Sequence, residues 1–268
     1  MKNRRLRLLP LALTLAIAPC VAEPDEYARR RDDDALGSVL VHIEHKNCAA
    51  PVKALNQGVA EKQPSVLLLA GSMFESGLCV KPNWDKAADF YQLAHAAGHQ
   101  GAVPRLVSGY AEKNRDPGAA LWWLSSQAWM PVPCRSANHV TNDPDAFVAA
   151  LNKWPKGQVA ACVYLGGVAA RVMGDVEFPA RGAQQGVLGD AVMHFVPSAG
   201  TITWKAKATD RVSVSRVVRA GRDERSVFED TFLKHLREVS DRALRQFTKP
   251  EGIDPAWELY KEFSFTYQ

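Results

Sequence analysis

The chain has 268 residues, with 33 basic and 29 acidic side chains and five cysteines. Its first 22 residues hold four of the basic side chains and no acidic one, so the other 246 residues carry 29 charges of each sign and no formal net charge. A neutral chain lacks the electrostatic footprint that nucleic acids and anionic lipids attract. We therefore expect neither as a partner.

Residues 1–22 are predicted to be a cleavable signal peptide. Four basic residues precede an apolar run at 8–18, and the small residues Cys20 and Ala22 stand at the cleavage-determining positions. The apolar run is too short for a bilayer, which needs about 20 residues. This argues against the alternative of an uncleaved anchor, and Pro19 argues against lipidation at Cys20. We expect a periplasmic protein with no membrane span after signal cleavage.

Four cysteines remain after the signal: Cys48, Cys79, Cys134 and Cys162. An even number in an oxidising compartment indicates two disulfides, for which three connectivities are open. We favour Cys48–Cys79 and Cys134–Cys162, because each of these bonds would tie a loop to a neighbouring helix. The alternative is four unpaired, buried thiols. No two of them have the close spacing of a structural zinc site.

The composition and the hydrophobic pattern of the sequence change once along the chain. This change predicts an α+β fold in two domains. Residues 35–172 are rich in Ala, Leu and Trp at helical spacing, whereas 177–268 show short alternating runs and one long amphipathic helix. Closely spaced Pro and Asn residues predict a loop at 131–144.

The first domain contains a repeated helix pair. A helix is predicted over 65–75 and stopped by Gly77, and a second over 85–97 with Asp85 as N-cap and Gly98 as stop. A similar pattern restarts at Ala102. Repeated helix pairs of this length predict an α-solenoid, in which each pair buries its apolar face on the next.

This unit resembles the Sel1-like repeat, a relative of the tetratricopeptide repeat. The matching positions are Leu69, Ala70, Met73, Phe74, Gly77, Val80, Asp85, Lys86, Ala87, Tyr91, Ala94, Ala97, Gly98 and Ala102. The second unit is shortened at 113–116, and 48–62 resembles a degenerate first unit. The resemblance implies a scaffold for protein contacts in which the repeat itself carries no chemistry.

The second domain resembles the TonB C-terminal domain. The resemblance begins with an aromatic-Pro pair, Phe178 and Pro179, followed by glycines and a strand with Ala191, Val192 and Phe195. A turn at 198–200, a second strand at 201–207, a helix at 224–247 and a last strand at 260–267 complete the order. The helix places on one face Phe228, Phe232, Leu236, Val239, Ala243 and Phe247. A strand at 212–219 is additional to the family pattern.

The TonB-like resemblance implies capture of an extended peptide at a sheet edge, by main-chain hydrogen bonds. The final strand, with Phe263, Phe265 and Tyr267 on one face, is the candidate edge. The implied partner is an envelope protein or an extended peptide, for instance from an outer-membrane protein. Because the chain has a cleavable signal and no Pro-rich spacer, we expect a borrowed binding fold and not an energy transducer.

No pattern of catalytic residues is evident, and we expect no enzyme, cofactor or metal. His42 and His45 lack helical metal-ligand spacing, and Gly98 separates His95 from His99. The Trp122–Trp123 pair could stack a sugar or a base, but it is more typical of helix packing. Two alternatives stay open: a structural accessory of an envelope secretion or transport apparatus, and an envelope enzyme with its site between the domains. The sequence leaves the oligomeric state open.

Overall fold

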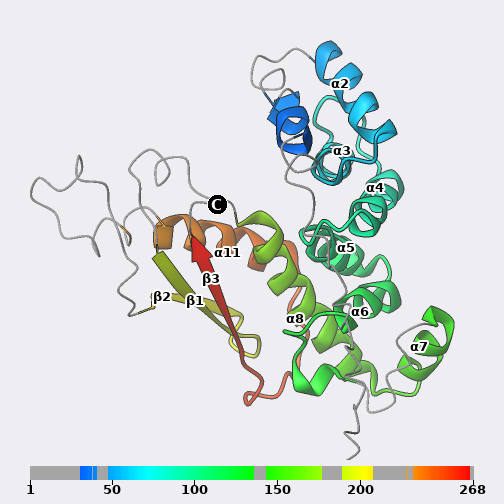
Figure 1. Cartoon of the computed structure of the whole chain (residues 1–268). Helices are drawn as coiled ribbons and strands as arrows, with labels where there is room; N and C mark the ends of the chain where they lie inside the picture. The colour runs from blue at the N-terminus through cyan, green and yellow to red at the C-terminus, as the bar shows by residue number, and fades with distance from the viewer. Residues whose placement is uncertain are drawn as a thin grey trace, which may run out of the picture.

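The computed structural model describes residues 31–37, 39–40, 48–135, 143–176, 189–207, 228 and 232–265. These residues form an α+β fold, in which an N-terminal helical region is followed by a small three-stranded antiparallel sheet with a helix (Figure 1). The predicted fold class is confirmed at this level. The predicted strand at 212–219 and the start of the predicted helix at 224 lie outside the described residues.

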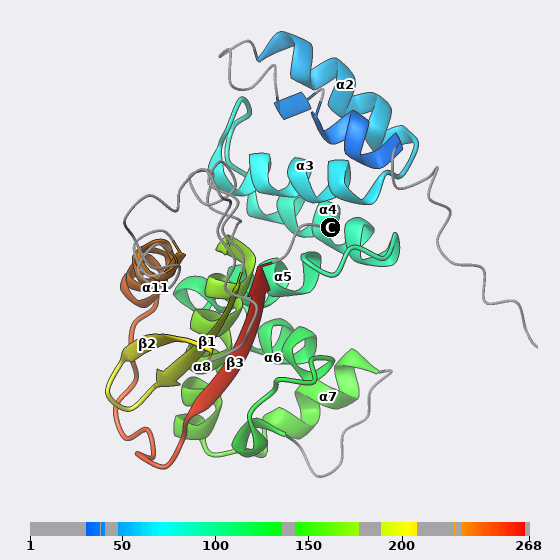
Figure 2. The same ribbon diagram turned by 60° about the vertical axis from the view of Figure 1, so that its left-hand side comes forward.

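The helical region is a row of short helices that pack on their neighbours in the chain. They are α2 (Ala49–Ala60), α3 (Pro64–Ser76), α4 (Trp84–Ala96), α5 (Ala102–Ala111), α6 (Pro117–Ser125), α7 (Pro144–Leu151) and α8 (Lys156–Asp175), with 3-10 turns η1 (Glu112–Asn114) and η2 (Val132–Cys134). The 20-residue α8 packs on both α5 and α6, and it lies between these shorter helices and the sheet (Figures 1 and 2).

The predicted helix boundaries in the repeat are nearly correct, with one correction. Gly77 ends α3 with φ 76°, in the left-handed region that glycine adopts without strain. The N-cap of α4 is Asn83 and not Asp85, because the Asn83 side chain accepts a hydrogen bond from the Lys86 backbone N–H at 3.0 Å. Asp85 lies one residue into the helix, where its charge still suits the helix dipole.

The sheet has the order β2-β1-β3, with β1 (Gly189–Val196) in the centre and antiparallel to β2 (Thr201–Ala206) and β3 (Leu259–Phe265). The register places Met193 opposite both Trp204 and Lys261. α11 (Lys234–Gln246) packs against β2 and α8 and buries Leu236, Val239 and Ala243, which the helical periodicity placed on one face.

A single hydrophobic cluster joins the helical region to the sheet. It includes buried residues from α5 to α8, from all three strands and from α11. The Tyr164 ring on α8 meets the Phe195 ring on β1 with centroids 6.0 Å apart. Residue 172, where we expect the first domain to end, lies in the last turn of α8; the domain boundaries stay a prediction. None of the described helices is both long and apolar enough to span a bilayer.

Gly109 leaves the space that the Trp84 ring occupies. A Cβ atom at residue 109 would lie 1.7 Å from Trp84 Cη2. The Trp84 ring cannot withdraw easily, because it meets the Tyr110 ring edge-on at 5.3 Å and carries the Arg115 guanidinium 5.0 Å from its centroid. We expect Gly109→Ala to lower the free energy of unfolding by about 1–3 kcal/mol, the usual cost of overpacking.

Urea denaturation would measure this effect, with Gly157→Ala in the first turn of α8 as the matched control. No atom lies within 4 Å of a Cβ at residue 157, so alanine there should leave stability unchanged or slightly raise it. An equal change in the two variants would contradict the packing account.

Candidate functional site

The outer edge of β3, which pairs with no other strand among the described residues, is the first feature with a binding geometry. Among the described strands, β3 pairs with β1 alone, through seven residue pairs from Gly189↔Phe265 to Phe195↔Leu259. An unpaired edge offers a row of backbone N–H and C=O groups to another chain. The predicted final strand therefore exists and ends one side of the described sheet.

Two of the residues predicted to mark this edge point into the core. Phe263 packs against Trp204 with ring centroids 5.2 Å apart, and Phe265 packs against Phe232 at 4.7 Å. Phe265 is buried and Phe263 is half-buried, and their side chains hold β3 against the core; their part in binding stays a prediction. Tyr267, the third predicted residue, lies outside the described residues.

The opposite face of β3 carries side chains that the sequence reasoning missed. Tyr260 is 60% exposed, and the strand's alternation places Glu262 and Ser264 on the same side. The signal was present in the sequence as the other half of the same alternating pattern. If the edge binds an extended segment, these are the side chains beside it on the outer face of the sheet.

Three side chains, those of His194, Glu258 and Tyr260, contact one another at the start of β3. The Tyr260 ring stacks on His194 of β1 with centroids 4.3 Å apart and planes 4° from parallel. Glu258 Oε2 accepts a hydrogen bond from the Tyr260 hydroxyl at 2.8 Å and lies 3.2 Å from His194 Nε2. The hydrogen bond to Glu258 raises the pKa of Tyr260, so this hydroxyl remains a donor at neutral pH.

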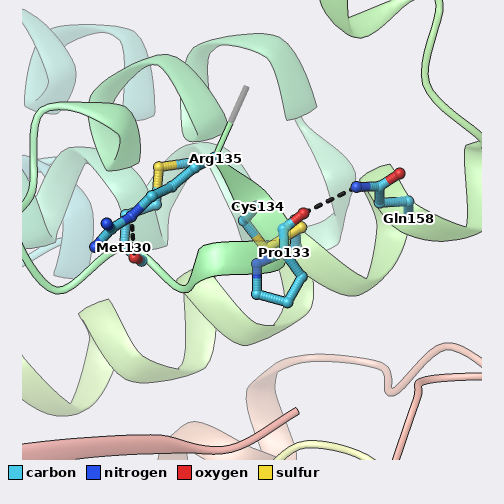
Figure 3. Close-up of a disulfide and its surroundings, with 6 residues drawn as sticks. Met130, Pro133, Cys134, Arg135 and Gln158 are labelled. Atoms are coloured by element: carbon cyan, nitrogen blue, oxygen red, sulfur yellow. Dashed lines mark hydrogen bonds between the residues drawn. A yellow bond between two sulfur atoms is a disulfide. The ribbon is translucent and has the colours of Figure 1, made fainter. Parts of the chain in front are cut away.

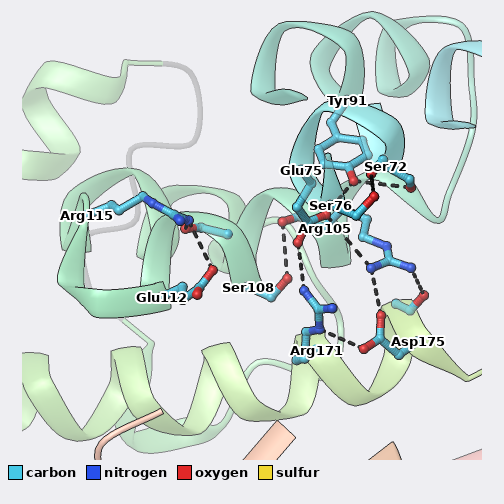
Figure 4. Close-up of polar contacts among 12 residues, drawn as sticks. Ser72, Glu75, Ser76, Tyr91, Arg105, Ser108, Glu112, Arg115, Arg171 and Asp175 are labelled. Carbon is cyan, nitrogen blue, oxygen red and sulfur yellow. Dashed lines mark hydrogen bonds and ion pairs between the residues drawn. The ribbon is translucent and has the colours of Figure 1, made fainter. Parts of the chain in front are cut away.

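Four charged residues form a second feature, here called the charge cluster: Glu75, Arg105, Arg171 and Asp175 (Figure 4). They come from α3, α5 and α8. Arg171 donates to Glu75 and to Asp175, each at 2.7 Å, and Arg105 reaches Asp175 at 2.7 Å. The four side chains are only 13–21% exposed, so the cluster binds three helices together from within.

The surroundings of Arg171 and Tyr91 set the protonation of these two side chains. Burial alone would lower the pKa of Arg171, but the charges of Asp175 and Glu75 outweigh it and raise that pKa. The Tyr91 hydroxyl donates to Glu75 at 2.5 Å, and burial together with the Glu75 charge raises the pKa of Tyr91. The tyrosine therefore stays neutral, and the cluster cross-links α3, α5 and α8.

Both disulfides join the cysteines that the sequence reasoning favoured. Cys48 bonds to Cys79, and Cys134 bonds to Cys162. The second bond is buried and ties η2 to α8, where Gln158 also donates to the Pro133 carbonyl at 2.8 Å (Figure 3). The Arg135 side chain donates a hydrogen bond to the Met130 carbonyl at 2.9 Å. The residues on both sides of Cys134 are therefore anchored.

The histidine and tryptophan pairs take part in packing. His95 meets the Trp123 ring edge-on at 5.3 Å, while His99 Nδ1 accepts from the Gly101 N–H at 3.1 Å. Trp122 meets Phe147 at 5.5 Å. His42 and His45 lie outside the described residues. Among the residues that the structure describes, no three His, Cys, Asp or Glu side chains are grouped as metal ligands.

No known protein family, curated protein or solved structure matches this chain. The candidate sites therefore rest on geometry and chemistry alone. The β3 edge is the feature with the clearest binding chemistry, because the backbone groups on its outer side have no strand partner within the described sheet while its core-facing side chains are packed.

Proposed function

We propose that this protein is a periplasmic protein-binding scaffold that captures an extended segment of an envelope protein at the β3 edge. In this proposal the helical row is a Sel1-like solenoid, and the sheet with α11 is a TonB C-terminal-like module without energy transduction. The observation that carries the proposal is the edge position of β3 in the sheet order β2-β1-β3.

The physical case for strand capture is preorganisation. Phe263 and Phe265 hold β3 against Trp204 and Phe232, so little conformational freedom remains to be lost when a partner strand arrives. A segment that adds to β3 would gain main-chain hydrogen bonds whatever its sequence. Selectivity would then come from the outward side chains Tyr260, Glu262 and Ser264.

The cysteine pairing supports the proposed location in the periplasm. Two disulfides suit an oxidising space, and the export signal predicted at residues 1–22 would deliver the chain to one. The helical row supports the scaffold role, because the charge cluster links α3, α5 and α8 into a rigid surface.

Site-specific photo-crosslinking from the β3 edge would test the proposal. A benzophenone amino acid at Tyr260 should form an adduct with an envelope protein in cells, and hydrogen exchange of the purified complex should show newly protected β3 amides. We expect Tyr260→Lys/Ser264→Lys to weaken binding of that partner by roughly tenfold, since two favourable cross-strand side-chain pairs are lost.

Thr203→Lys is the matched control, because Thr203 is also exposed but lies on β2. It should leave binding unchanged. Protection confined to the helical region, with β3 exchange unaltered in the complex, would show that the partner binds elsewhere and would rule out strand capture.

A further inference from the structure

Three adjoining pockets lie along the helical region, and none of them is lined by a residue of β3. Its first pocket, about 480 Å³, lies among α6, α7 and α8; its second, about 220 Å³, lies between α8 and the end of α11; its third, about 600 Å³, adjoins the charge cluster. The first two share Asn114, Ala160 and Val163, and the last two share Lys113 and Gln246. We call the three together the α6–α8 groove.

The lining changes character along the groove. The first pocket is mostly apolar, with Val148, Leu151, Trp154, Val159 and Val163. The third is polar, and its lining has four basic side chains against three acidic ones. An occupant that matches the groove must therefore be apolar at one end and polar at the other.

The unpaired charge in the groove is positive. In the third pocket Glu75 and Asp175 are paired within the charge cluster, and Glu112 pairs with Arg115 at 3.2 Å. Lys113, at the junction of the second and third pockets, and Lys156, on the first, are exposed and make no ion pair with any described residue. The groove thus has a charge that would complement an acidic occupant.

The backbone at the junction is held in a strained form. Lys113 and Asn114 are consecutive non-glycine residues in the left-handed region, with φ 54° and 52°. Lysine seldom adopts this conformation, and asparagine adopts it more readily; it persists where the surroundings impose it. Here the Asp116 N–H donates to the Tyr110 carbonyl, and Arg115 donates to the Gly109 carbonyl at 2.7 Å. These hydrogen bonds hold the turn that places Lys113 on the lining of both the second and the third pocket.

We infer that the α6–α8 groove binds an extended acidic peptide segment, with apolar side chains in the first pocket and a carboxylate beside Lys113. Three pockets in a row suit successive side chains of an extended chain. The walls are already rigid, because the Cys134–Cys162 bond and the charge cluster fix α8 at two points. This site would recognise the side chains of the peptide, whereas the β3 edge would pair with a backbone. It shares no residue with β3 and does not depend on strand capture there.

Fluorescence anisotropy with labelled synthetic peptides tests the inference. The probe is Leu-Trp-Leu-Ala-Glu-Glu, used with its reversed sequence and with versions in which Lys-Lys replaces Glu-Glu. The protein should bind one of the acidic probes about tenfold more tightly than its basic counterpart, the size expected of two exposed charge pairs. Lys113→Glu/Lys156→Glu should reverse that preference. Val148→Arg, which fills the first pocket, should weaken binding of all the probes.

The controls place the same changes outside the groove. Lys53→Glu/Lys234→Glu reverses two exposed charges on α2 and α11, and Val132→Arg alters a valine that is 75% exposed on η2; both should bind as the unaltered protein does. Thermal melts would confirm that every variant is folded. No preference between acidic and basic probes, or equal effects of groove and control variants, would overturn the inference. So would binding of laurate, a small anionic amphiphile, without binding of either acidic peptide.

Discussion

Removing the Cys134–Cys162 disulfide with alanine at both positions should lower the free energy of unfolding by about 4–5 kcal/mol. Loop closure over a sequence separation of 28 residues accounts for about 3.5 kcal/mol of this. Both sulfurs are fully buried in the main hydrophobic cluster, so their loss also leaves a cavity that costs about 1 kcal/mol. Urea denaturation under non-reducing conditions measures the change.

Cys48→Ala/Cys79→Ala is the matched control. Its separation of 31 residues has almost the same loop-closure term, but Cys48 is exposed and no comparable cavity would form. It should cost less than the buried pair. Mild reductant should open Cys48–Cys79 first, as mass spectrometry after alkylation would show. A larger loss from the Cys48–Cys79 variant would contradict the role assigned to burial.

Replacing Glu75 by alanine should lower the free energy of unfolding by about 3 kcal/mol, as expected when one member of a buried ion-pair network is removed. Arg171 would lose a partner at 2.7 Å, and the Tyr91 hydroxyl would lose its shortest hydrogen bond. Chemical denaturation gives the magnitude. Glu75→Gln keeps one of the two acceptor oxygens and the shape of the side chain, so it should lose less.

The control is Glu262→Gln on β3. Glu262 pairs with Lys207, but the two side chains are 45% and 43% exposed, and exposed pairs contribute at most about 1 kcal/mol. If Glu75→Ala and Glu262→Gln had equal effects, the charge cluster would not be the cross-link that its burial indicates.

The helices and strands could largely be predicted from local patterns. Gly77 and Gly98 mark helix ends because only local backbone conformation is involved, and the alternation in 259–265 indicates a strand without knowledge of its neighbours. The N-cap of α4 was misplaced by two residues because Asn83 and Asp85 are equally suitable in type. Only the hydrogen bond to Lys86 distinguishes them.

The sites could be predicted less well, since they depend on residues far apart in the chain. Arg171 and Glu75 are 96 residues apart, and no local spacing relates them. For β3 the alternation located two faces but did not say which one the core would cover. The aromatic face, chosen as the binding face, is the one that Trp204 and Phe232 bury.

The contact between α8 and α11 bears on how this chain can change during evolution. A Cβ at Gly167 would lie 2.7 Å from Phe247 Cε1 and 2.8 Å from Ala111 Cβ, so a side chain there must suit both halves at once. A gene fusion that moved either half into another protein would leave the apolar surface of its neighbour uncovered. The helical region and the sheet module are therefore expected to be inherited together, and to diversify at their outer surfaces.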